Sequence, residues 1–336
     1  MRGLIVTSIA QFRAEGNQKA ACIFVKKGYT KYNRYKTRRR GSPCQSGAGK
    51  REMRMFSNQP RKFYRRSPLI EVICQLRFPD ILKIEAHEPA DFQDAIRSIY
   101  PQYAKRIEQL PPQNAGGKMV EQGTVNNYQF ISADGGWKVS LTKGFIALST
   151  TRYTRWEEFA KRLDVVLAAF IKIYQPAYFT RVGLRYMNAV NKAALGFAET
   201  PWHELIAPGY LGLMADEDAR RQVFIKCEQL VTVTMPGGAK ANIKCGPGLL
   251  RKVDNRTRQV DEQKVFMLDL DVFFDGKMPL GQVAGALNIV HDNAGSLFSG
   301  AVRQPLLDAM EPAGAFSLAE GFHVRFCSLK GGLNSA

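Results

Sequence analysis

Two kinds of hydrophobic spacing alternate along residues 67–312 of this 336-residue chain. Apolar residues at every second position predict β-strands, and they occur at 68–78, 125–150 (three short strands), 178–190, 222–234, 240–246 and 265–275. Apolar residues three or four positions apart predict helices, at about 89–103, 154–175 and 279–299, with a short closing helix near 306–310. Short turns join several neighbouring strands, as they do in antiparallel sheets. The pattern predicts an α+β fold, with mainly antiparallel sheets and three main helices packed on them.

Residues 154–175 form the clearest of the expected helices. Thr154 and Glu157 have the spacing of a capping box, a continuous apolar stripe follows, and Pro176 ends the helix. Such a stripe is typical of a helix that packs on a core. The order of elements suggests a loose two-fold repeat, and the loop-like stretch 192–220 could divide the domain into two halves. The polar stretch 247–262 is expected to be a surface loop.

Three segments carry a resemblance to a known family. The first is PLIEVICQLRFP (68–79), which contains P-L-x-E-V-x-x-x-x-R-F; the second is TRYTRWEEFAKRL (151–163); the third is RVGLRYMNAV (181–190), which contains R-x-G-L-R-Y-x-N. Together they resemble a sporadically distributed prokaryotic family of conserved proteins of unknown function, over about residues 68–312. The resemblance implies that residues 1–54 are additional and that 313–336 are a divergent tail. It implies no catalytic residue.

The charge of the chain is concentrated at one end. Residues 1–66 hold 18 Lys and Arg against two acidic residues, whereas residues 67–336 hold 30 basic and 28 acidic residues, so +16 of the net charge of +18 lies in this extension. Its most basic stretch contains Lys31, Arg34, Lys36, Arg38, Arg39 and Arg40. An asymmetry of this size indicates a basic arm rather than a basic domain surface.

Three interpretations of the basic arm are open. It could be a disordered or mis-assigned extension, because Met53 and Met55 stand just before the first convincing strand and residues 1–54 show no sustained apolar period. It could be a tail that binds nucleic acid through phosphates. It could also be a targeting presequence, because it is rich in arginine and poor in acidic residues.

The remaining composition argues against several classes of protein. No apolar run reaches the roughly 18 residues of a transmembrane helix, so no membrane association is expected. The six cysteines are scattered, with no C-x-x-C pair, which argues against a disulfide framework and a zinc site. A reducing cytoplasm is the expected location.

The most informative polar residues lie on two predicted strands. Arg181 and Arg185 share one face of 178–190, and Asp269 and Asp271 share one face of 265–275, because side chains alternate along a strand. If the strands are neighbours, these residues would form cross-strand ion pairs, each worth about 0.2–1 kcal/mol. Alternatively, the aspartates could hold a divalent cation, or the arginines could bind a carboxylate or phosphate.

No residue is nominated as catalytic. The chain has no H-E-x-x-H, nucleophile elbow, Walker loop or G-x-G-x-x-G motif, so the sequence leaves the cofactor unknown and nominates no metal ligands. His291, Asp292 and Asn293 are consecutive in the last long helix. Adjacent helix residues do not face each other, so these residues do not form a catalytic dyad, and a solvated helix face is expected for them.

Three functions follow as hypotheses, in this order. The first is a non-catalytic binding or assembly module with a protein partner or a homo-oligomer, because many strands could offer edges to a partner. The second is a nucleic-acid-associated protein that acts only through residues 1–66. The third is a metal-dependent enzyme that uses the strand carboxylates.

Overall fold

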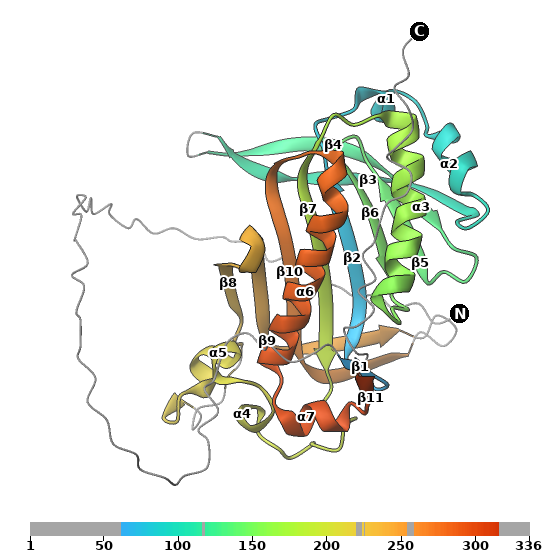
Figure 1. Cartoon of the computed structure of the whole chain (residues 1–336). Coiled ribbons are helices and arrows are strands. Elements are labelled where there is room, and N and C mark those ends of the chain that lie inside the picture. The colour runs from blue at the N-terminus through green and yellow to red at the C-terminus, as the bar shows by residue number, and fades with distance from the viewer. Residues whose placement is uncertain (1–61, 116–117, 220–223, 225, 254–258, 316–336) are drawn as a thin grey trace, which may run out of the picture.

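The computed structural model describes residues 62–115, 118–219, 224, 226–253 and 259–315, and Figure 1 shows their arrangement. Nine of the described strands form one antiparallel sheet in the order β3-β4-β5-β6-β2-β7-β10-β9-β8. These strands are β2 (Leu69–Arg77), β3 (Gln102–Ala115), β4 (Lys118–Ile131), β5 (Trp137–Leu141), β6 (Phe145–Thr150), β7 (Phe179–Val190), β8 (Gln229–Thr234), β9 (Lys240–Val253) and β10 (Val260–Met278). The predicted α+β class is confirmed.

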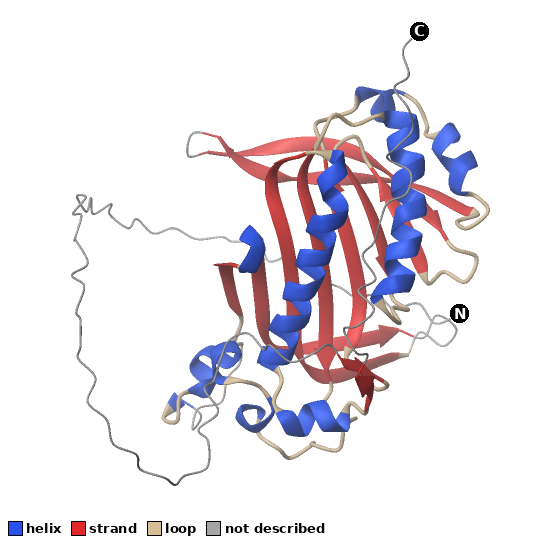
Figure 2. Cartoon of the chain, viewed as in Figure 1, coloured by secondary structure: helices blue, strands red, loops and turns tan. Residues whose placement is uncertain are grey.

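Two long helices, α3 (Trp156–Tyr174) and α6 (Val283–Ala301), lie on the same face of the sheet (Figure 2). The shorter helices are α1 (Leu82–Ala86), α2 (Ala90–Ile96), α4 (Trp202–Leu205), α5 (Pro208–Leu211) and α7 (Gln304–Ala309), with 3-10 turns at η1 (Gly212–Ala215), η3 (Pro236–Gly238) and η4 (Leu280–Gln282). The apolar stripes of α3 and α6 pack against alternate residues of the central strands, such as Val72, Val182 and Val272, which are fully buried. Burial of each such side chain favours folding by about 1.5–3 kcal/mol.

The elements repeat their order along the chain. In each half a central strand is followed by short helices, then by antiparallel strands that run from the outer edge back to the central strand, and finally by a long helix. β2 to α3 make the first half and β7 to α6 the second, and β2 pairs with β7 at the middle of the sheet. The second half begins with β7, after the connection from Gln175 to Tyr178. The stretch 192–220, which the sequence suggested as a division between two halves, therefore lies inside the second half.

The helix expected over 89–103 is much shorter. α2 ends at Ile96, and Tyr103 belongs to β3, where it is paired with Phe130 of β4. The two rings are 5.7 Å apart between centroids, so pairing in the sheet overrides the helical spacing of the apolar residues. Pro101 contributes as well, because proline cannot donate a backbone hydrogen bond within a helix.

The prediction of a surface loop over 247–262 is wrong for most of that stretch. β9 continues to Val253 and β10 begins at Val260, so the two strands extend the same hairpin. Polar residues are tolerated there because they pair across the strands, as Arg251 Nε does with Glu262 Oε1 at 2.6 Å. Leu250 and Val265 also form a small buried cluster apart from the main core.

The capping box expected at the start of α3 is absent. Arg155 is the N-cap residue and makes no side-chain cap, and Thr154 Oγ1 donates instead to Glu158 Oε2 at 2.5 Å. The helix ends where expected, at Tyr174, and its C-cap Gln175 has a left-handed backbone (φ 45°) just before Pro176.

Both ends of the described chain meet beside the main sheet. β1 (Lys62–Tyr64) pairs antiparallel with β11 (Pro312–Ala315). The sequence assigned β1 to the N-terminal extension, 1–66, and all of β11 except Pro312 to the tail, 313–336. The folded unit therefore reaches a few residues further in each direction than its apolar pattern indicates. The expected closing helix is present as α7.

Candidate functional site

The arginines and aspartates singled out in the sequence meet on the face of the sheet opposite α3 and α6. Their strands are neighbours, and Arg185 lies directly opposite Asp271. Arg185 donates from Nε and Nη2 to Asp269, at 2.7 and 2.5 Å, and Arg181 Nη2 donates to both oxygens of Asp271, at 2.7 and 2.8 Å. The cross-strand ion pairs predicted for these strands are therefore observed.

Gly183 makes the geometry of Arg181 possible. The Arg181 side chain runs along β7 over Gly183, where an added Cβ would lie 2.3 Å from its Nη1 atom. The guanidinium carbon also lies 4.4 Å from the centroid of the Phe273 ring, a cation–π contact. The group that approaches Gly183 most closely is thus the Arg181 side chain.

The environment of these pairs favours a structural role. Asp269 is only 12% exposed, and its hydrogen bonds are the largest of the effects that raise the pKa of Arg185. The carboxylate oxygens that would ligate a cation already accept guanidinium N–H groups. Within the described ranges, no group of three or more His, Cys, Asp or Glu side chains could hold a metal ion.

His291 lies in the core rather than on the solvated face expected for it. It is 7% exposed, its ring stacks on Trp156 at 4.4 Å between centroids, and its Nδ1 is 2.6 Å from the hydroxyl oxygen of Tyr186. The sequence holds a signal for this burial, because His291 follows the buried Leu287 by four residues and therefore shares its face of the helix. Asn293 is also buried, and its Nδ2 donates to the carbonyl oxygen of Pro236 at 2.9 Å.

The two outermost strands of the sheet differ sharply. β3, at one edge, contains Lys105, Arg106 and Glu108, and two register shifts interrupt its pairing with β4. It also contains Pro111 and Pro112, which have no backbone N–H. All of these features are known to block the pairing of further strands with an edge.

β8, at the opposite edge, has the sequence QLVTVT, with no charged residue and no proline. Leu230, Thr232 and Thr234 are exposed, and Gln229, Val231 and Val233 are half-buried against the helix side of the sheet. Figure 1 shows β8 at the border of the sheet, with α5 near its lower end. In the described part of the chain, no strand pairs with its outer edge.

Contacts at both ends hold β8 in place. At its start, Gln229 Nε2 donates to the carbonyl oxygen of Gly209 at 3.4 Å. At its end, the η3 turn is closed by a hydrogen bond from the Met235 amide to the carbonyl oxygen of Ala239 at 2.7 Å. The backbone of Gly237 in this turn packs against Ile289 of α6. The edge is therefore presented on a fixed hairpin.

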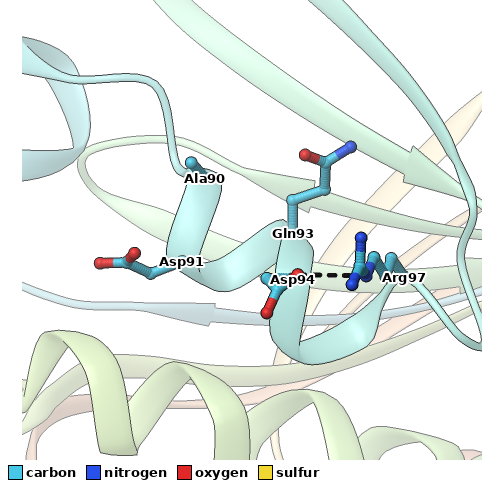
Figure 3. Close-up of a pocket in the computed structure, with 5 residues that line it drawn as sticks. All are labelled: Ala90, Asp91, Gln93, Asp94 and Arg97. Atoms are coloured by element: carbon cyan, nitrogen blue, oxygen red, sulfur yellow. Dashed lines mark ion pairs between the residues drawn. The ribbon is translucent and has the colours of Figure 1, made fainter.

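A hollow on α2 is a weaker candidate for a binding site (Figure 3). It is lined by Ala90, Asp91, Gln93, Asp94 and Arg97. All five come from one short helix and the residue that caps it, and Arg97 Nε pairs with Asp94 Oδ1 at 3.1 Å in an exposed ion pair. Among the described residues no second element lines the hollow, so a ligand would be held from one side only.

The structure adds little about the remaining predictions. The basic arm, Lys31 to Arg40, lies outside the described residues. None of the helices that the structure describes has both the length and the apolar character needed to span a bilayer. The chain matches no protein-family model and no curated protein.

Proposed function

We propose that this protein is a non-catalytic assembly module that binds a protein partner by accepting one of the partner's strands at the outer edge of β8. The observation that carries the proposal is the uncharged, proline-free edge of a strand whose position is otherwise fixed. The predicted membership of a prokaryotic family of unknown function is compatible with this role. Free thiols at Cys74, Cys227 and Cys245 support a place in the reducing cytoplasm.

The chemistry of such binding lies mainly in the backbone. An edge strand presents a row of unpaired N–H and C=O groups. A partner strand that pairs with them supplies affinity through main-chain hydrogen bonds, and alternate side chains supply specificity. The six residues of β8 match the commonest strand length in proteins, so the edge is long enough to hold one ordinary strand.

The other edge of the same sheet supports the assignment. A soluble protein that must not pair through its edges places charges, prolines or bulges on them, and β3 has all three. β8 has none of them and exposes Leu230 to 70%. The sheet is therefore protected on one side and left open on the other, as a module with one strand-binding edge requires.

The experiment uses matched positions on the two edges. Leu230 and Ile107 are equally exposed, at 70% and 71%, so a photoreactive amino acid can replace either in the full chain. Irradiation in the cells that make the protein should give a discrete adduct from position 230 and none from 107. The adduct should disappear when Thr232→Lys adds a charge to the edge, and mass spectrometry of the adduct should place the partner peptide against β8.

Some outcomes would overturn the proposal. Equal adducts from both positions would mean that exposure alone causes the reaction. No adduct from 230, or an adduct that persists in Thr232→Lys with unchanged yield, would mean that no strand is added at β8. At a concentration at which both are monomeric, the thermal unfolding of Thr232→Lys should differ from that of the wild type only by the loss of one exposed hydrogen bond, from Thr232 Oγ1 to Asn242 Oδ1 at 2.8 Å.

A further inference from the structure

We infer that the partner at β8 is a second copy of this chain, so that two β8 strands pair antiparallel about a two-fold axis. The inference rests on the proposed function and specifies its partner. A two-fold axis gives both copies the same surface, so the edge must be complementary to itself. Three features of the described residues satisfy this condition: the register, the flanking charges and the exposed apolar residues.

The alternation of side chains restricts the register. Both copies must keep their helices on the same side of the joined sheet, so exposed residues must pair with exposed residues and half-buried ones with half-buried ones. A register that satisfies this places Thr232 opposite the partner's Thr232 and Leu230 opposite the partner's Thr234. Val231 then lies opposite the partner's Val233. Cross-strand pairs between β-branched residues are favourable, and no like charges meet.

The charges near β8 differ between its two ends. At the start, Glu228 pairs with Lys244, which is opposite Leu230, at 2.6 Å and with the exposed Lys226 at 3.8 Å, so one positive charge is left over. At the end, Lys240 is opposite Thr234 and pairs with Asp275, with 2.9 Å between Nζ and Oδ2, so this end is neutral. Antiparallel pairing of two copies brings the start of one strand beside the end of the other. Each positive cluster then meets a neutral ion pair rather than the other positive cluster, which keeps the two like charges apart.

Exposed apolar side chains also lie at both ends of β8, on the helix side of the sheet. Leu213 is exposed in η1, next to Gly212, which lies beside Gln229 at the start of the strand. Ile289 is partly exposed on α6, against Gly237 just beyond the end of the strand. The two-fold axis brings the region of Leu213 beside the region of the partner's Ile289, so water-exposed apolar surface would be covered twice.

The inference is tested with the purified full chain by sedimentation velocity over a range of concentrations, at high salt to screen the basic arm. The wild type and Ile107→Lys should form the same concentration-dependent dimer. Thr232→Lys should raise the dissociation constant at least tenfold, because it places two like charges opposite each other. Under mild oxidation Thr232→Cys should form a 232–232 disulfide, mapped by peptide mass spectrometry, and Ile107→Cys should not.

Contrary outcomes separate this inference from the proposed function. A wild type that stays monomeric at every concentration, or a Thr232→Lys dimer of unchanged affinity, overturns the pairing of two copies. If the photoadduct from position 230 then contains a different protein and is lost in Thr232→Lys, strand addition stands with another partner. If that adduct is also absent, both proposals fail. A disulfide that maps to position 231 in Val231→Cys, but not to 232 in Thr232→Cys, overturns the register.

Discussion

β3 and β8 occupy equivalent places, since each is the outermost strand of its half of the molecule. Their backbones offer the same kind of hydrogen-bonding edge, and their side chains treat it in opposite ways. β3 is long, interrupted and charged, whereas β8 is short, regular and neutral. The comparison teaches that a position at the edge of the sheet does not by itself make a strand a binding site. The side chains decide, because charges, prolines and bulges block the pairing of a further strand.

The largest effect is expected from a glycine beside the β8 edge. Gly246 of β9 has a φ of 153°, and an added Cβ would lie 2.2 Å from the carbonyl oxygen of Cys227, just before β8. Gly246→Ala should lower the free energy of unfolding by about 2–4 kcal/mol, because backbone atoms must move. At Gly123 of β4, beside the other edge, an added Cβ would meet no described atom within 4 Å apart from its chain neighbours, so Gly123→Ala should change the free energy of unfolding by less than about 0.5 kcal/mol. Urea denaturation of both variants measures the two losses of stability. Equal losses would contradict the expected difference between the two edges.

A smaller effect is expected at the centre of the sheet, which supports both edges. Asp269→Ala removes a shielded carboxylate and leaves Arg185, which is 42% exposed, without it. If the pair were completely buried, breaking it would lower the free energy of unfolding by about 3–5 kcal/mol. Because the arginine is partly exposed, we expect a loss of about 2 kcal/mol. The control is Asp94→Ala, whose ion pair with Arg97 is exposed and should cost no more than about 0.5 kcal/mol. Equal denaturation midpoints for the two variants would show that the central pairs add no stability.

The protection of β3 should be removable. Lys105→Thr with Arg106→Thr leaves the bulged, proline-containing end intact and takes two positive charges from the edge. We expect this double variant to self-associate about tenfold more tightly than the wild type, equal to about 1.4 kcal/mol. Because each molecule then has two open edges, species larger than a dimer should appear in sedimentation. Adding Thr232→Lys should remove those species, and unchanged association of the double variant would show that the charges do not guard the edge.

The smallest effect is a dependence on pH that differs between the edges. A hydrogen bond from Lys244 lowers the pKa of Glu228, and one from Lys240 lowers the pKa of Asp275. A carboxyl group with a lowered pKa stabilises the folded state above its ordinary pKa of about 4, and this contribution is lost as the pH falls through the lower folded value. Both pairs are exposed, so the loss below pH 4 should be under about 1 kcal/mol.

The β3 edge should respond at the other end of the pH scale. A hydrogen bond to Glu88 raises the pKa of Lys105, so its stabilising effect is complete below the ordinary pKa and is lost as the pH rises through the folded value. Chemical denaturation at acid, neutral and alkaline pH measures both effects. The acid-sensitive part should shrink in Lys244→Met with Lys240→Met, and the alkaline part in Lys105→Met, whereas the contributions of Asp134, whose pKa is lowered, and of Tyr174, whose pKa is raised, should remain. A variant that keeps the full pH dependence of the wild type would refute the assignment.

Much of the fold could be predicted from the sequence because burial imposes a period. The strands at 68–78 and 178–190 and the helices α3 and α6 each bury one regular stripe. The prediction fails where contacts with other parts of the chain, rather than the spacing of apolar residues, decide the structure. The hairpin over 247–262 is polar and held by cross-strand pairing, and His291 is a polar residue that a tyrosine hydroxyl and an indole ring accommodate in the core.

The candidate site shows the same division. The ion pairs of Arg181 and Arg185 could be predicted from alternation on two strands, given that the strands are neighbours. The exposed edge of β8 could not, because its six residues look like any ordinary strand until the order of the whole sheet is known. Which strand is outermost depends on pairings between residues that lie far apart along the chain, and local periodicity does not specify them.

The antiparallel pair of β2 and β7 at the middle of the sheet bears on how such a chain could arise. Each half places its long helix on the same face and sends its remaining strands outward from this pair. One ancestral half, dimerised through its first strand, would build the same sheet from two separate chains. Gene duplication and fusion would then need only a short connection from the end of one long helix to the next first strand, and Gln175 to Tyr178 is such a connection.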